Sequence, residues 1–263
     1  MINSMQLALI KKDIRAIASN KRLFSVLWII PIVFTVVFPT IFILTTTLAP
    51  LGSNDLQELI YLLPSGAKSG DLRTDIINVI FNNILPVFFL LIPIMAASVM
   101  AASSFVGEKE KHTLETLLYC PLTLKQIFSA KVFASFILSM FVSITSFAIM
   151  ITVVETELWF FMGDLILPNI SWLVLMLLVS PAISLIAITL IVRGSAKAQS
   201  VEESQQRSIF LILPIILLAA GQFTGVMLIN VWILLGLGIA LAVIAWFAVK
   251  SSFGKYNYET LLK

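Results

Sequence analysis

A short charged segment, residues 105–131, carries most of the reactive side chains that lie between two apolar stretches of this chain. It contains Glu108, Lys111, Glu115 and the only histidine, His112. Carboxylate, ammonium and imidazole groups can serve acid–base chemistry or bind a metal. Nothing beside His112 supplies a nucleophile or a second metal ligand, so we interpret it as a solvated surface side chain.

The spacing of these residues indicates a helix and not a catalytic site. Read as a helix over 107–118, the segment places Glu108, Lys111 and Glu115 on one side, spaced for pairing as Glu108–Lys111 and Lys111–Glu115. Pro121 then ends the helix. A helix that merely solvates a turn is the alternative, and the pattern leaves it open. The other side of the helix is apolar and consists of Leu114, Leu117 and Leu118.

The composition indicates the class of protein that must position this segment. Hydrophobic residues make up 59% of the 263 residues and charged residues only 12%, against about 25% charged in a soluble domain. The chain is therefore predicted to be an integral membrane protein. Its 17 Lys and Arg against 14 Asp and Glu are spread through loops, which argues against a nucleic-acid partner.

Six apolar windows have the length, about 20 helical residues, that a bilayer core requires. They predict an all-α integral membrane protein with one transmembrane domain, residues 1–263. The stripe of Leu7, Ile10, Ile14 and Ile17 predicts an interfacial helix within 1–22. Residues 50–78 form the one long external loop, and 105–120 the charged helix. The predicted spans are 24–48, 80–104, 127–153, 172–192, 209–229 and 231–249, the last two joined by a tight connection.

The basic residues predict the orientation of these spans. With a cytoplasmic N-terminus, all Lys and Arg except Lys68 and Arg73 fall in cytoplasmic segments. This asymmetry follows the positive-inside rule, and an even number of spans returns the C-terminus to the cytoplasm. The charged helix is then cytoplasmic. Trp159 and Trp172 are predicted to be interfacial anchors.

Several kinds of chemistry lack the residues they need. The deepest charges in the spans are Lys131, Glu155 and Glu157, all within reach of an interface, so no span places an ion-coupling charge near its middle. A single cysteine, Cys120, gives no basis for a metal or redox site. The chain has no phosphate-cradling Gly-rich loop of its own. Energy for any work is therefore expected from another chain.

Uncharged polar residues in the spans have two interpretations. They are Asn82, Asn83, Ser143, Thr145, Ser146 and Gln222. We expect most of them to hydrogen-bond between helices, and the alternative is that some line a substrate route.

The sequence from Glu108 to Lys131 resembles a signature of ABC-2 type transporter permeases. That signature reads E-x-E-x-x-T-L-E-x-L-L-x-x-P-L-S/T-x-x-x-I-x-x-x-K. The resemblance implies six membrane helices per subunit and a second permease subunit in a homo- or heterodimer. It also implies two cytoplasmic P-loop ATPase subunits, where ATP and Mg²⁺ would bind. His112 stands where many relatives carry glycine, which bears on the detailed fit to that ATPase. The resemblance also implies that the segment is a coupling helix that contacts the ATPase through Glu108, Glu110, Lys111, Thr113, Leu114, Glu115, Leu117 and Leu118.

Three functions follow as hypotheses. The first is a permease subunit of an ABC exporter in a prokaryotic cell membrane, surrounded by lipid. The second is an ion-coupled secondary carrier, against which the uncharged middles of the spans count. The third is an ABC assembly that serves signalling or envelope biogenesis instead of transport.

Overall fold

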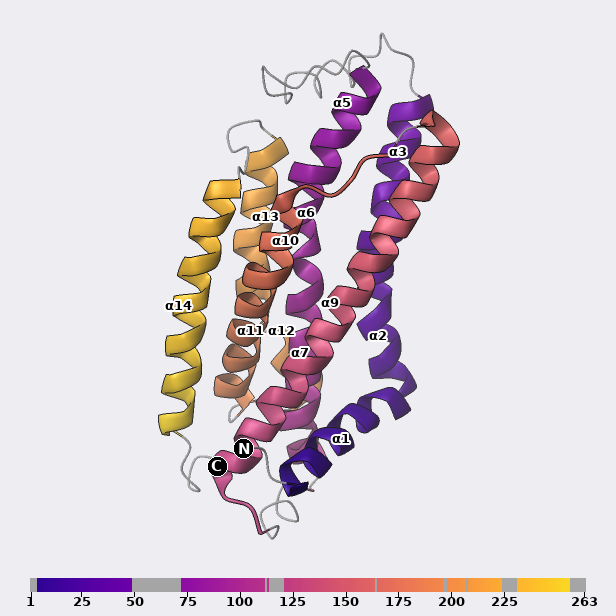
Figure 1. Ribbon diagram of the computed structural model, residues 1–263. Coiled ribbons are helices and arrows are strands. Elements are labelled where there is room, and N and C mark those ends of the chain that lie inside the picture. Colours follow the sequence, from indigo (N-terminus) through magenta and orange to yellow (C-terminus); the bar gives the residue numbers. More distant parts are fainter. Residues whose placement is uncertain are drawn as a thin grey trace.

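The computed structural model describes residues 4–48, 72–111, 113, 121–163, 165–195, 198–206, 208–223 and 231–255. Within these ranges every regular element is a helix (Figure 1). Six helical stretches are long and apolar enough to cross a membrane, which confirms the predicted all-α class. In chain order the elements begin with α1 (Ser4–Ser19), α2 (Lys21–Ile32), η1 (Val33–Val37), α3 (Phe38–Leu48), α5 (Leu72–Val79), η2 (Ile80–Ile84) and α6 (Leu85–Phe89). They continue with α7 (Leu91–Glu110), α9 (Leu124–Met162), α10 (Ile170–Val174), η3 (Leu175–Val179), α11 (Ser180–Ser195), α12 (Val201–Gln206), α13 (Ile209–Phe223) and α14 (Val231–Lys255).

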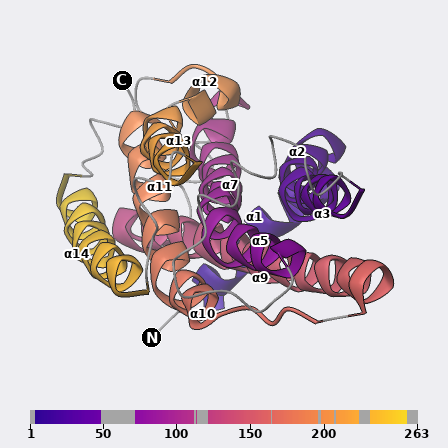
Figure 2. The same cartoon turned by 90° about the horizontal axis from the view of Figure 1, so that it is seen from above.

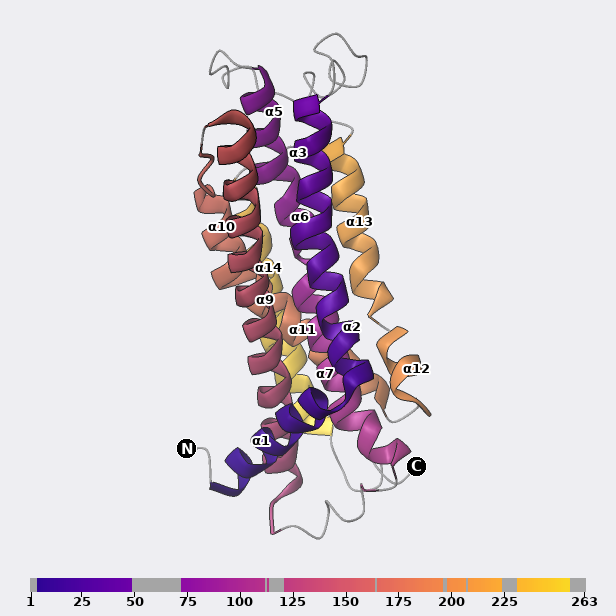
Figure 3. The same cartoon turned by 90° about the vertical axis from the view of Figure 1, so that its right-hand side faces the viewer.

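Helix α1 lies across one end of the bundle, at a steep angle to the spans (Figures 1 and 3). Its Leu9, Ile10 and Ile17 are buried against residues of α7 and α9, whereas Leu7 is 62% exposed. Asn20 ends the interfacial segment and caps α2, because its side chain accepts hydrogen bonds from the first backbone N–H groups of that helix. The predicted stripe therefore holds from Ile10 onward.

Three spans contain a five-residue π-helical segment, and each is followed two residues later by proline. Segments η1, η2 and η3 precede Pro39, Pro86 and Pro181. Proline has no N–H and crowds the carbonyl four residues earlier, and in all three spans that carbonyl lies inside the π segment. A widened turn accommodates the missing hydrogen bond without breaking the span.

The second span, α5 to α7, occupies the centre of the bundle (Figure 2). Of its most apolar window 83% is buried, a larger share than in any other span, and α7 packs against α9 and α11. Residues 72–79 form α5, so the predicted external loop 50–78 is wrong for 72–78. A search for apolar windows misses α5 because Arg73 and Asp75 lower the hydropathy of this stretch, although the helix is continuous with the span.

Helix α9 is longer than the predicted span 127–153. It starts after Thr123, which forms a capping box with Gln126, and it ends at Gly163 in the left-handed conformation, φ 74°. Its 39 residues make a rod of about 58 Å, nearly twice the bilayer core of about 30 Å. Figure 1 shows α9 inclined across the bundle.

The other predicted spans differ from the helices by a few residues. The first helical stretch begins at Lys21 instead of 24, and the fourth runs from Ile170 to Ser195 instead of 172–192. Helix α13 starts at the predicted residue 209 and α14 continues to Lys255, beyond the predicted 249. The predicted tight connection around Asn230 lies outside the described residues, as does the predicted end of the fifth span at 224–229.

Candidate functional site

A group of charged side chains joins α1, α7 and α9 at the α1 end of the bundle. We name it the charged junction and define it by Lys12, Asp13, Ser104, Glu108 and Lys131. Its members come from positions up to 119 residues apart in the chain, and packing of α1 against α9 brings them together.

Lys131 is the centre of the charged junction and is only 3% exposed. Its Nζ donates to the backbone carbonyl of Ser104, lies 3.5 Å from Asp13 Oδ2 and 3.9 Å from Glu108 Oε1. It also sits 5.6 Å from the centre of the Phe105 ring, within range of a cation–π contact. A buried ammonium group needs this many partners because desolvation of an unpaired charge costs several kcal/mol.

Asp13 is the anionic partner that α1 supplies. It is 5% exposed, and its Oδ2 accepts a hydrogen bond from the Ser104 hydroxyl at 2.5 Å. Ser104 thus contacts both charges, since Lys131 Nζ also lies 3.3 Å from its Oγ. These bonds fix the interfacial helix to the two longest spans.

Glu108 is the second anion and faces into the protein. Its carboxylate accepts from Lys12 of α1 and from the Thr113 hydroxyl, and its side chain is 11% exposed. The predicted pairing with Lys111 is wrong, because no described ion pair joins the two and the carboxylate turns to Lys12 and Lys131. The side chain of Glu108 therefore does not present the outward contact that the resemblance implied.

The end of α7 also contacts the segment between the fourth and fifth spans. Glu110 is exposed and accepts the backbone N–H of Val201 at 3.2 Å, at the first residue of α12. An exposed ion pair, Arg22–Glu202 at 3.2 Å, joins α2 to the same short helix and adds about 0–1 kcal/mol. Figure 3 shows α12 and α1 at the same end of the bundle.

The predicted coupling helix 105–120 does not begin as a separate element at Gly107. Residues 105–110 are the last turns of α7, which ends with Lys111 as its C-cap, and Thr113 N–H bonds the Glu108 carbonyl. The helix continues because its apolar packing against α9 and α11 persists to Val106 and Gly107, which are buried. His112, Leu114, Glu115, Leu117, Leu118 and Cys120 lie outside the described residues.

Only Glu108 of the charged junction was a predicted site residue, and the sequence held a signal for two of the other four members. Asp13 falls three residues after Ile10 and four before Ile17, on the apolar stripe of α1. Lys131, read as a side chain reaching the interface, follows Ile127 by one helical turn in an apolar span. A carboxylate and an ammonium that each interrupt an apolar face are expected to pair.

Uncharged polar side chains join spans at the opposite end. Trp172 Nε1 donates to the Phe81 carbonyl at 3.2 Å and Gln222 Nε2 to the Asn83 carbonyl at 2.9 Å, so two carbonyls of η2 are satisfied by other spans. Asn82 accepts the backbone N–H of residue 169 at 2.8 Å. Bonding between spans is confirmed for the Gln222 side chain, and Asn82 bonds to the N-cap residue of α10, whereas Asn83 takes part through its backbone carbonyl. Ser143, Thr145 and Ser146 bond to carbonyls of their own helix.

Trp172 corrects one further prediction. Its side chain is 1% exposed and packs on the rings of Phe81, Phe89 and Phe147 at centroid distances of 5.2–5.8 Å. It is therefore a core residue and not an interfacial anchor. Trp159 is 68% exposed, and its anchoring role stays a prediction.

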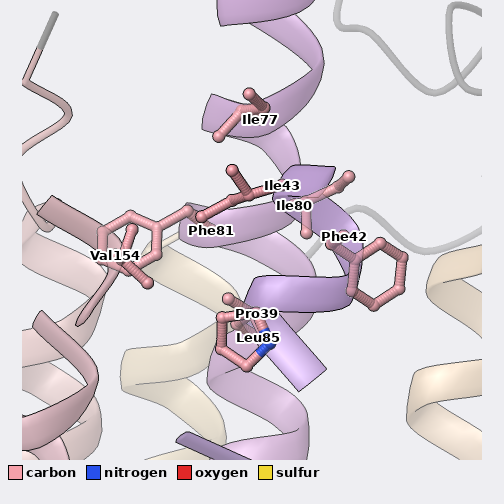
Figure 4. A pocket seen from close by; sticks show the side chains of 8 residues that line it. All are labelled: Pro39, Phe42, Ile43, Ile77, Ile80, Phe81, Leu85 and Val154. Atoms are coloured by element: carbon pink, nitrogen blue, oxygen red, sulfur yellow. The ribbon is translucent and has the colours of Figure 1, made fainter. Parts of the chain in front are cut away.

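An apolar pocket lies between α3, the η2 region and α9 (Figure 4). Its volume is about 10 Å³, about the space of one water molecule. No polar side chain lines it, so a substrate would find no group to orient it. The charged junction remains the site with defined chemistry, and no cluster of metal ligands occurs among the described residues. The pocket is lined by Pro39, Phe42, Ile43, Ile77, Ile80, Phe81, Leu85 and Val154.

Six apolar helical stretches in the described part of the chain, the second buried among the others, define a multi-pass integral membrane protein. The family model described as ABC-2 type transporter matches residues 6–234, from α1 into the first turn of α14. The chain belongs to the ABC-2 type transporter family and is a membrane component of an ABC transporter. No curated protein and no solved structure matches it.

Proposed function

We propose that the chain is the permease subunit of an ATP-driven exporter. Two such subunits, identical or different, form the pathway, and two copies of a cytoplasmic P-loop ATPase bind ATP and Mg²⁺ and drive it. Both termini and the charged junction lie on the cytoplasmic side of a prokaryotic cell membrane. Family membership and the signature from Glu108 to Lys131 support this assignment.

One observation carries the mechanism: polar contacts join the end of α7 to three other elements, α1, α9 and α12. Glu108 contacts α1 and lies 3.9 Å from Lys131 of α9, while Glu110 contacts α12. A force applied to the residues that follow α7 would therefore move α1, α9 and α12 together, since buried ion pairs resist separation.

The signature residues then divide into two groups. Leu114, Glu115, Leu117 and Leu118, with Lys111 at their start, form the contact with the ATPase. Glu108, Glu110 and Thr113 transmit its movement to the spans through the hydrogen bonds described above. This division differs from a model in which all eight residues touch the partner.

The division is tested by co-purification with the tagged ATPase and by ATP hydrolysis in the reconstituted complex. Glu115→Lys is expected to reduce association about tenfold, as the loss of one charged contact does. Glu108→Gln is expected to keep association and to lower permease-dependent ATP hydrolysis. Lys125→Gln, an exposed change on α9, is the matched control. Equal association and hydrolysis in all three variants would refute the coupling role.

A further inference from the structure

A cavity of about 190 Å³ lies between α1 and the end of α7. An apolar cavity of about 150 Å³ accommodates benzene, so this one has room for a small chemical group. Its wall on α7 changes from Met100 through Ser103 to Gly107, and Lys111 completes the open end. These residues span about 16 Å along the helix, from apolar to charged.

The charges around this cavity do not balance. Lys12 and Lys111 line it together with two carboxylates, Asp13 and Glu108, and the buried Lys131 lies behind these carboxylates, outside the lining. Both carboxylates already accept from Lys131 or Lys12. Among the described residues, no ion pair involves Lys111, which is exposed at the rim. Counted with Lys131, which neutralises the carboxylates from behind, the charged groups at the cavity have one positive charge in excess, and the cavity favours an anion.

The position of the cavity indicates which anion reaches it. Helix α1 has the amphipathic pattern of a helix in the membrane interface, and the cavity lies beneath it with Met100 on the side of the spans. The polarity of its wall matches a phospholipid in the same leaflet, whose chains point to the membrane centre. We propose that this cavity binds the phosphate group of a phospholipid, with Lys111 and Lys12 as its cationic contacts.

The geometry assigns different roles to the two lysines. Lys12 binds Glu108 with one of its three N–H donors, and its side chain is 52% exposed, so donors remain for a phosphate oxygen. Among the residues that the structure describes, Lys111 has no carboxylate partner to release. A bound phosphate would balance the excess positive charge without breaking the Lys131–Asp13 pair. The binding needs no ATPase, so its test is independent of the exporter assignment.

The test uses the full chain in a neutral detergent and three probes: dioctanoyl phosphatidylglycerol, dioctanoylglycerol, which lacks the phosphate, and inorganic phosphate. Titration calorimetry and native mass spectrometry measure binding. Only the phospholipid is expected to bind, and Lys111→Gln is expected to weaken it about tenfold, the effect of one charge-assisted hydrogen bond. Lys111→Arg should retain binding. Lys11→Gln, an exposed lysine of α1 outside the cavity, should leave it unchanged.

A second variant separates the cavity from general surface charge. Ser103→Leu fills the space without a change in charge and is expected to reduce phospholipid binding, with the melting temperature in lipid-free detergent as the measure of folding. Equal weakening by Lys11→Gln and Lys111→Gln would overturn the site in favour of surface attraction. Equal binding of dioctanoylglycerol, or binding of inorganic phosphate alone, would overturn the phospholipid as its occupant.

Discussion

Replacement of Lys131 by methionine should reveal how strongly the charged junction holds α1 to the bundle. Methionine has a similar length and no charge. It would remove the ammonium that lies 3.5 Å from Asp13 and that donates to the Ser104 carbonyl. Asp13 would keep only the Ser104 hydroxyl as its described partner, at 5% exposure.

The expected magnitude follows from that burial. Removal of one partner of a buried ion pair costs about 3–5 kcal/mol because the other charge stays desolvated. We expect about 3 kcal/mol for Lys131→Met, since the Ser104 hydroxyl still serves Asp13. Asp13→Asn should cost a similar amount. The double variant should lose about 2 kcal/mol less than the sum, because it leaves no unpaired charge between these positions.

The measurement is unfolding in mixed micelles by titration with a denaturing detergent, followed by tryptophan fluorescence, for the two single variants and the double variant. Lys125→Met is the control, because Lys125 is exposed on the same helix two turns earlier. Its cost should stay within about 0.5 kcal/mol. A coupling energy below about 0.5 kcal/mol between positions 131 and 13 would refute the buried pair.

Two further predictions use the same unfolding assay. Trp172→Phe leaves the Phe81 carbonyl without its N–H donor and should cost about 1–3 kcal/mol, while Trp159→Phe, at an exposed position, should cost under about 0.5 kcal/mol; equal effects would contradict the buried hydrogen bond. A methyl group at Gly238 would lie 2.7 Å from a leucine side chain of η3, so Gly238→Ala should cost about 1–3 kcal/mol. Gly236→Ala meets nothing within 4 Å and should stabilise α14 by up to about 1 kcal/mol; a loss there as large as at Gly238 would show that close packing is not the cause.

The spans could be predicted from sequence because a bilayer requires a fixed length of apolar helix. The ends of the helices could not be predicted, because backbone hydrogen bonding continues where the hydropathy of the sequence falls. Arg73 and Asp75 lie in a helix that an apolar window excludes, and Leu158 to Met162 extend α9 beyond two glutamates. The π segments before the prolines at 39, 86 and 181 were not predicted, nor was the bond from Trp172 to a carbonyl of η2, which comes from another span.

The charged segment was the best guide to the site, yet its side chains act differently from the prediction. Helical spacing pairs Glu108 with Lys111, but spacing along one helix omits what other helices bring. The partners of Glu108 come from α1 and α9, at positions 12 and 131. Such contacts between separate helices depend on tertiary packing and leave only weak signals in the sequence, such as Asp13 on an apolar stripe.

The length and continuity of α9 have a geometric consequence for transport. Between Leu124 and Met162 the helix contains neither proline nor glycine, whereas the first, second and fourth spans have π segments beside their prolines. It is held near one end by Lys131 and near the other by a hydrogen bond from Thr40 to Glu157. If such a rod of about 58 Å pivots by about 10° at its midpoint, its two ends move about 5 Å in opposite directions. A pivot of α9 that closes the bundle at one membrane face would therefore open it at the other.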